Sequence, residues 1–117
     1  MGTNYYAVRN KASLEQPIHI GKNSIGWLFC FQEQKDTWRD IPVEWHTYNQ
    51  VKEWLEKYVV EKKEYVILDE YDRLIYYEDF INLIESKQKD KRILSNPENF
   101  NYCKNVDGYR FSDGEFC

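Results

Sequence analysis

The residues of this sequence that could bind a metal or act as nucleophiles are few. They are the histidines His19 and His46 and the cysteines Cys30, Cys103 and Cys117. Zinc prefers imidazole and thiolate ligands, but no two of these five residues stand at a ligand-like spacing, and the sequence has no Cys-x-x-Cys pair. A Cys–His nucleophilic pair needs an activated thiolate, and the apolar run around Cys30 disfavours one. We therefore expect no catalytic residue, no metal site and no cofactor.

Two groups of carboxylates are the next candidates for chemistry. Asp69, Glu70 and Asp72 form one group, and Asp113 and Glu115 form the other. Paired carboxylates can act as acid and base when burial separates their pKa values. Both groups stand in turn-like segments without an implied apolar pocket, so we expect them to be solvated.

The segment from Gly21 to Gly26 superficially suggests a phosphate-binding loop. It lacks the GxxxxGK[ST] pattern and leads into a strand instead of a helix N-terminus, so a hairpin turn is the simpler interpretation. A turn with a lysine and unpaired amides can still contact a small anion. Lys22 and Ser24 are therefore the candidate ligand-binding residues.

The densest acidic stretch places five carboxylates within eleven residues and interleaves them with tyrosines. Carboxylates speed association with a positively charged partner, and tyrosines supply rigid contact area. The alternative interpretation is a solvated hairpin turn before a helix, because acids are favoured near a helix N-terminus. The candidate partner-binding residues are Asp69, Glu70, Tyr71, Asp72, Tyr76, Tyr77, Glu78 and Asp79.

Length and composition limit the class of protein. The 117 residues suit a single domain, residues 1–117, and 42% hydrophobic with 31% charged residues is a globular composition. No apolar run approaches the roughly 20 residues of a membrane span, and no signal-peptide pattern begins the sequence. The odd number of cysteines, three, is typical of a reduced, cytoplasmic protein. A net charge of −4 argues against broad nucleic-acid binding.

The elements that must position these residues begin with a predicted hairpin. Residues 3–9 form a β-prone run, and residues 18–20 alternate between apolar and polar side chains. Residues 25–32 are the most hydrophobic run and are apolar on both faces, which predicts a central strand. A turn near residues 22–24 is expected to join the last two segments.

The second half of the sequence predicts two helices. Residues 33–46 are expected to form a loop, after which Thr47 caps a helix that runs to about residue 62. Its apolar positions recur at helical spacing: Val51, Trp54, Leu55, Tyr58 and Val59. The other expected elements are a strand at 64–69, a turn at 70–73, a short strand at 74–76, a helix from Tyr77 that turns Phe80, Ile81 and Ile84 inward, an irregular stretch at 93–108 and a last strand at 109–111.

Together these elements predict an α+β fold: a small antiparallel sheet with two helices packed on one face. The expected core comprises Trp27, Phe29, Trp54, Leu55, Phe80 and Ile84. Aromatic residues make up 17% of the chain, with ten Tyr, six Phe and four Trp. A domain of this size has too little interior for all twenty, so some tyrosines are expected at a binding surface.

Three segments also carry a resemblance: MGTNYY at 1–6, IHIGKNSIGW at 18–27 and DGYRFSDGEF at 107–116. Together they resemble a group of small uncharacterised proteins encoded by tailed bacteriophages, and the turn from Asp69 to Arg73 fits the same pattern. Similar proteins often carry a Cys-x-x-Cys-like pair after the first strand. Here residues 10–16 hold no cysteine, so a zinc site of that kind is not expected.

The resemblance implies a context instead of an activity. Small acidic phage proteins without catalytic motifs often bind and inhibit a host protein in the host cytoplasm, frequently a defence component such as a CRISPR–Cas nuclease. A non-catalytic inhibitor with an acidic and aromatic surface is therefore the expected function. Two alternatives stay open: a protein that sequesters a nucleotide signal by tyrosine stacking and Lys22, and a small metal protein or enzyme.

Overall fold

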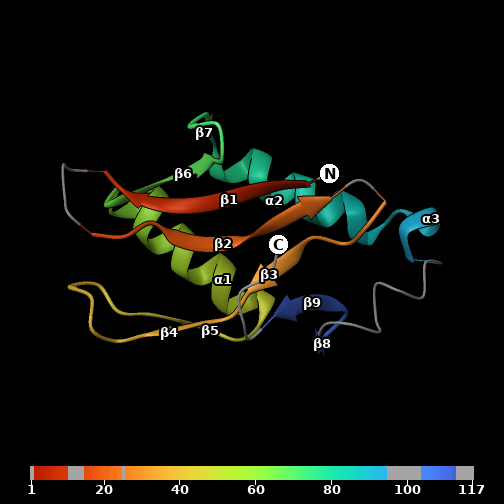
Figure 1. Ribbon diagram of the computed structural model, residues 1–117, viewed down its shortest axis with the longest axis horizontal. Helices are drawn as coiled ribbons and strands as arrows, with labels where there is room; N and C mark the ends of the chain where they lie inside the picture. The colour runs from red at the N-terminus through yellow and green to blue at the C-terminus, as the bar shows by residue number, and fades with distance from the viewer. Residues whose placement is uncertain (1, 11–14, 25, 95–103, 113–117) are drawn as a thin grey trace.

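The computed structural model describes residues 2–10, 15–24, 26–94 and 104–112, and these residues form the predicted α+β fold (Figure 1). The main sheet is larger than predicted, with seven strands in the order β7-β6-β1-β2-β3-β9-β8. It is also mixed, because β3 and β9 run parallel whereas the other neighbours are antiparallel. Its strands are β1 (Gly2–Arg9), β2 (Ile18–Ser24), β3 (Cys30–Gln32), β6 (Tyr65–Asp69), β7 (Leu74–Ile75), β8 (Lys104–Val106) and β9 (Tyr109–Ser112).

The two predicted helices lie on one face of this sheet, behind it in Figure 1. Helix α1 (Tyr48–Leu55) begins where the sequence predicts, since the Thr47 side chain accepts a hydrogen bond from the Gln50 amide at 3.2 Å. The chain then widens into a π-helical segment, η1 (Glu56–Glu61), in which the Lys62 amide donates to the Lys57 carbonyl at 2.9 Å. Helix α2 (Tyr77–Gln88) and the short α3 (Lys91–Leu94) follow.

The first hairpin forms, but its turn is displaced toward the C-terminus. Residues 22–24 belong to β2, which runs to Ser24 and pairs Lys22 with Cys30. Of the strand predicted at 25–32, Cys30–Gln32 form β3, residues 26–29 lie outside any strand, and residue 25 is outside the described residues. Gly26 has a φ of 83° in the connection, a left-handed conformation that suits glycine.

The expected loop at 33–46 is instead a second hairpin, outside the main sheet. Its strands β4 (Gln34–Asp36) and β5 (Val43–Trp45) pair with each other. The three residues of β5 alternate between buried and exposed side chains, but β4 is wholly polar, so the sequence carries only a short strand signal. The Trp45 ring is fully buried and its Nε1 donates to the Gln32 carbonyl at 2.7 Å.

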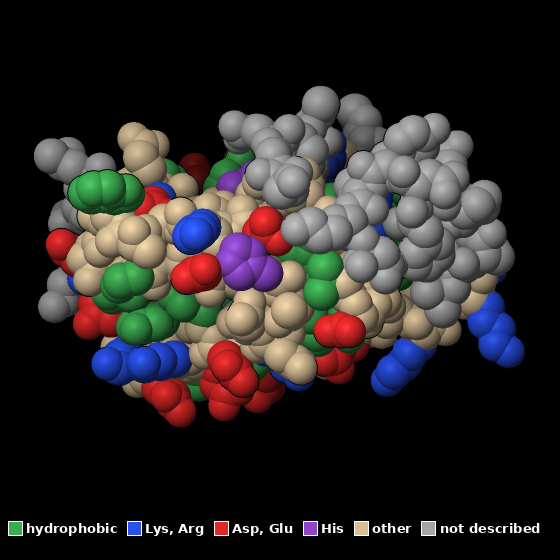
Figure 2. All heavy atoms as spheres, turned by 90° about the horizontal axis from the view of Figure 1, so that it is seen from below, with side chains coloured by type: hydrophobic (Ala, Val, Ile, Leu, Met, Phe, Trp, Pro, Cys, Tyr) green, Lys and Arg blue, Asp and Glu red, His purple; other side chains and the backbone are tan. Residues whose placement is uncertain are grey.

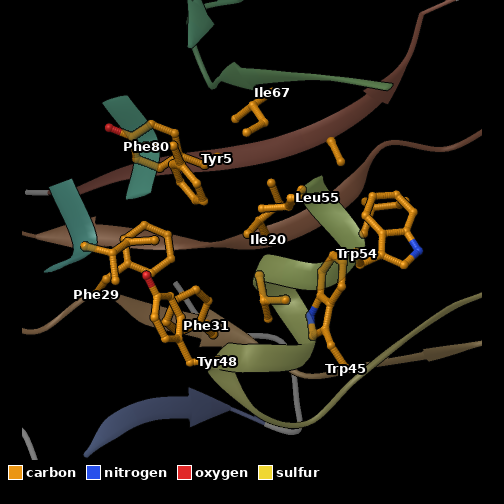
Figure 3. Packing of buried hydrophobic residues seen from close by; sticks show 14 of the residues in the cluster. Tyr5, Ile20, Phe29, Phe31, Trp45, Tyr48, Trp54, Leu55, Ile67 and Phe80 are labelled. Atoms are coloured by element: carbon orange, nitrogen blue, oxygen red, sulfur yellow. The ribbon is translucent and has the colours of Figure 1, made fainter. Parts of the chain in front are cut away.

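The core lies between the sheet and the two helices (Figure 3). Five of the six predicted core residues are buried: Phe29, Trp54, Leu55, Phe80 and Ile84. The Phe29 and Phe80 rings meet edge to face at 5.4 Å. Trp27 is the exception, because it precedes β3 and is only half buried, with the Arg110 guanidinium 5.2 Å from its ring centre.

On the face shown in Figure 2, acidic and basic side chains are interspersed, in keeping with the small net charge of −4. Within the described ranges, no helix is long and apolar enough to cross a membrane.

Part of the stretch at 93–108 that was predicted to be irregular belongs to α3 and β8. Cys103, Asp113, Glu115 and Cys117 lie outside the described residues.

Candidate functional site

The predicted partner surface begins at the β6–β7 turn, and the structure divides its residues into two kinds. Asp69 is 2% exposed and points into the turn instead of toward solvent. Its Oδ1 accepts hydrogen bonds from the Tyr71 and Arg73 amides at 2.8 and 3.0 Å, and its Oδ2 accepts one from Arg73 Nε at 2.7 Å. Asp69 therefore holds the turn together and is not available to a partner, contrary to its predicted role.

The pKa of Asp69 reflects this role. Burial alone would raise it, but the hydrogen bonds from the backbone and side chain of Arg73 and from the Tyr71 amide lower the pKa below its ordinary value. The ionised carboxylate is therefore the form that stabilises the turn, in which Asp72 has a φ of 61°.

The other residues of the turn are exposed. Glu70 accepts hydrogen bonds at Oε1 from the backbone and side-chain nitrogens of Asn4, at 2.7 and 3.3 Å. Tyr71 is 64% exposed, and the Arg73 guanidinium lies 5.3 Å from its ring centre. Asp72 is exposed at the tip.

The remaining four predicted residues come together in a groove between η1 and the N-terminus of α2. This hollow has a volume of about 570 Å³. Glu78 and Asp79 stand in the first turn of α2, where their negative charges interact favourably with the helix dipole. The lining residues are Glu56, Val60, Tyr76, Tyr77, Glu78 and Asp79.

An apolar hollow of about 370 Å³ adjoins the acidic one and shares Val60, Tyr76 and Tyr77 with it. It runs along β7 at the edge of the sheet. We call the two hollows together the edge groove. The apolar half is lined by Val59, Val60, Tyr65, Val66, Ile67, Leu74, Ile75, Tyr76 and Tyr77, with Asn10 and Lys63 as its polar residues.

Exposed apolar side chains gather at the edge groove. Among the large hydrophobic side chains that the described residues expose, Val60 (46%), Leu74 (52%) and Tyr76 (68%) all line it. Tyr77 is half buried, and its pKa is raised by burial and by the carboxylates of Glu56 and Glu85. The edge groove therefore has an apolar half and an acidic half, and we call the carboxylates of Glu56, Glu78 and Asp79 its acidic rim.

Sequence reasoning missed Glu56, Val60 and Leu74. Val59 and Val60 are adjacent in the sequence, and a helix turns two adjacent side chains in different directions, so one of them had to leave the core. The π-helical segment was not predicted. Such segments occur frequently at functional sites, and this one supplies Glu56, Val59 and Val60 to the groove.

The histidines do not form a metal or nucleophilic site with the described residues. His19 Nε2 lies 2.9 Å from Asn4 Oδ1, and its ring stacks on Tyr6 at 5.1 Å. His46 bridges Glu44 and Glu33 at 3.0 and 3.2 Å, and the hydrogen bonds to these carboxylates raise its pKa. No group of three or more His, Cys, Asp or Glu residues in the described ranges could hold a metal ion.

We expect thermal melts recorded with and without a chelator and a reductant to superimpose. The reason lies in the sequence, which has three cysteines and no Cys-x-x-Cys pair, so neither zinc nor a disulfide should stabilise the fold. Circular dichroism at the same protein concentration provides the measurement. A fall of several degrees in the chelator alone would restore a metal site.

The predicted ligand-binding residues both belong to strand β2 and not to a turn. Lys22 stands inside β2, opposite Asn4 of β1 and Cys30 of β3, and not in a turn. Ser24 ends β2, and its carbonyl accepts a hydrogen bond from Lys87 Nζ at 2.6 Å. The two residues therefore do not form the anion-binding turn that the sequence suggests.

The chain matches no protein-family model, no curated protein and no solved structure. A functional interpretation therefore has to follow from the residues and geometry of the edge groove.

Proposed function

We propose that this protein is a non-catalytic binding protein that holds a partner protein in the edge groove. The observation that carries the proposal is the gathering of exposed Val60, Leu74 and Tyr76 beside the carboxylates of the rim. Exposed apolar side chains bordered by polar ones are typical of protein interfaces. Tyrosine is enriched in such interfaces because it buries a large area and keeps a polar end.

The charges of the groove indicate the chemistry of the partner. Glu56, Glu78 and Asp79 line the acidic half, and the only cation that lines the described apolar half is Lys63. A segment that combines Lys or Arg side chains with an apolar anchor would satisfy both halves. Proteins that bind nucleic acids present such basic segments.

The resemblance to bacteriophage proteins supplies the biological context of the proposal. A host defence protein with a basic nucleic-acid groove, such as a CRISPR–Cas nuclease, is the expected target, and binding would block that groove in the host cytoplasm. Glu70, Tyr71 and Asp72 are exposed on the turn between β6 and β7, and we include them in the proposed partner surface. Asp69 is excluded from the surface because it is buried.

Reversing two charges of the rim tests this proposal. We expect Glu56→Lys with Glu78→Lys to weaken capture of a host protein by about tenfold or more, equivalent to roughly 1.4 kcal/mol, because two attractive contacts become repulsive. The residual binding should also depend less on salt. The measurement is the amount of host protein retained on the immobilised chain at low and high salt.

The matched control is Asp40→Lys with Glu53→Lys, which changes the net charge equally at two exposed residues outside the groove. This control should capture as well as the parent chain. Reversal of Glu78 removes a favourable helix-dipole contact of at most about 1 kcal/mol, so both variants are first shown to be folded. Equal capture by the groove variant and the parent at both salt concentrations would remove the edge groove as the partner site.

A further inference from the structure

The outer edge of strand β7 is a part of the edge groove that the proposed function leaves unused. β7 ends the main sheet, and among the described strands only β6 pairs with it (Figure 1). The register sets Ile75 opposite Ile67 and Leu74 opposite Leu68. An edge strand of this kind presents backbone donors and acceptors on which a segment of another protein can form a further strand.

The direction of the backbone groups of β7 follows from its pairing with β6. The Asp69 amide donates to the Arg73 carbonyl at 3.1 Å, so these two residues form a hydrogen-bonded pair. Hydrogen-bonded and non-hydrogen-bonded pairs alternate along an antiparallel ladder, so Leu74 directs its N–H and C=O away from β6. The amide of Tyr76, whose backbone is extended at φ −72° and ψ 147°, continues this outward row. No hydrogen bond within the described ranges uses these three groups.

The side chains of an added strand would alternate between the two faces of the sheet. Ile75 lies opposite Ile67, which is buried in the core, whereas Leu74 lies on the other face and is 52% exposed. Beside Ile75 lies the apolar half of the edge groove, which Val59 and Val60 of η1 also line. A residue that pairs with Ile75 therefore turns its side chain toward this apolar half.

The acidic half of the edge groove lies further along the chain direction of β7, where Tyr76 and Tyr77 lead into α2. Its carboxylates are those of Glu56, Glu78 and Asp79. In an antiparallel partner, the residues beside this half precede the residues beside β7. Successive side chains on one face of a strand are two residues apart, so a basic side chain that meets the carboxylates stands two residues before the apolar one.

We propose that the partner segment binds as an extended strand antiparallel to β7, with a Lys or Arg two residues before an apolar anchor. This inference rests on the proposed function and adds the conformation and the residue order of the bound segment. The antiparallel direction is favoured because antiparallel pairs are more stable per residue than parallel ones. Leu74 donates one backbone hydrogen bond to the added strand and accepts one, and the Tyr76 amide donates a third.

Two substitutions of Leu74 separate strand pairing from side-chain contact. Leu74→Ala and Leu74→Pro both remove the leucine side chain, but only proline also removes the outward N–H. Proline is tolerated on an edge strand whose N–H faces solvent, and thermal melts first establish that both variants are folded. We expect peptide probes to bind Leu74→Pro about tenfold more weakly than Leu74→Ala, because a carbonyl of the peptide loses its donor.

The probes come from a displayed library of short random peptides. The library is first depleted on the double variant Glu56→Lys with Glu78→Lys and is then selected on the parent chain, so that the enriched peptides depend on the acidic rim. We expect these peptides to share a Lys or Arg two residues before an apolar residue. Fluorescence anisotropy of synthetic copies measures their binding to the parent chain and to the two Leu74 variants.

Amide exchange in the parent chain gives a readout that needs no variant. A bound peptide should slow exchange of the Leu74 and Tyr76 amides by about tenfold or more, because both amides gain an acceptor. The internal control is the Arg73 amide, which already donates to Asp69 Oδ1 at 3.0 Å and should change little. Nuclear magnetic resonance measures the three rates with and without the peptide, and these rates decide the result if Leu74→Pro does not fold.

Three results would overturn strand addition. Equal binding to the two Leu74 variants, with unchanged exchange of the Leu74 amide, would mean that only side chains dock, and it would leave the proposed function intact. Self-association of the parent chain in sedimentation that Leu74→Pro abolishes would assign the edge to a second copy. Enrichment of no peptide that depends on the acidic rim would also reject strand addition, and the capture experiment with the reversed rim charges then decides the proposed function separately.

Discussion

Replacing Trp54 with alanine is expected to lower the free energy of unfolding by about 3–5 kcal/mol, the range for removing a large aromatic side chain from a core. Trp54 is 8% exposed. Its ring contacts those of Tyr58, Tyr65 and Trp45 at 4.9, 5.0 and 5.4 Å, and its Nε1 donates to the Pro42 carbonyl at 3.1 Å. The substitution removes these contacts together and leaves a cavity between α1 and the β4–β5 hairpin.

Trp38→Ala is the matched control, because it removes the same side chain from a position that is 97% exposed. We expect it to change stability by less than about 0.5 kcal/mol. Urea unfolding followed by circular dichroism measures both variants without depending on tryptophan fluorescence. A similar loss of stability in the two variants would contradict the packing of α1 described here.

The burial of Trp54 could be predicted from the sequence because a helix repeats its buried positions over several turns. Val51, Trp54 and Leu55 keep that spacing, and Thr47 marks the start. The same reasoning located α2 from Phe80, Ile81 and Ile84. Long periodic segments carry several independent signals, so one misleading residue does not change the result.

The segment before β3 shows why shorter elements are harder to predict. Its apolar run from 25 to 32 fits a buried strand, yet among the described residues of this run only Cys30–Gln32 form a strand, and Trp27 lies outside the core. What decides the start of β3 is its pairing with β2 and, in parallel, with β9, about eighty residues further along the chain. Local sequence contains no information on a partner so distant. The β4–β5 hairpin was missed because the hydrogen bond that anchors it, from Trp45 to the Gln32 carbonyl, lies outside the hairpin's own two strands.

The candidate site was located from composition but not in detail. The acidic and tyrosine-rich stretch does border the edge groove, through Tyr76, Tyr77, Glu78 and Asp79. The groove also needs Glu56 and Val60 from η1, some twenty residues earlier, and the packing of η1 against β6 and α2 brings these together. The number of acidic residues in the stretch could not distinguish the buried carboxylate of Asp69 from the exposed carboxylates, because buried and exposed acidic residues look the same in a sequence.

Asp69 provides the second large expected effect. Asp69→Ala should lower the free energy of unfolding by about 2–4 kcal/mol, since it removes the charged acceptor of the Tyr71 and Arg73 amides and the contact with Arg73 Nε. Asp69→Asn should lose less, because the amide oxygen can still accept hydrogen bonds. A partner-binding test that includes Asp69 would therefore report unfolding of the turn, and the groove variants leave this residue unchanged.

The pH dependence gives this prediction a signature that simple loss of packing lacks. The folded-state pKa of Asp69 lies below its ordinary value near 3.8, so the carboxylate contributes stability above that value and loses it as the pH falls through the lower, folded-state pKa. The difference in unfolding free energy between the parent and Asp69→Asn should therefore be constant near neutral pH and shrink in acid. The control is Asp72→Asn, three residues away at the exposed tip with a φ of 61° that asparagine also adopts. Asp72→Asn should change stability little at any pH, and a parent–Asp69→Asn difference that stays constant down to pH 2 would mean that the charge of Asp69 does not stabilise the turn.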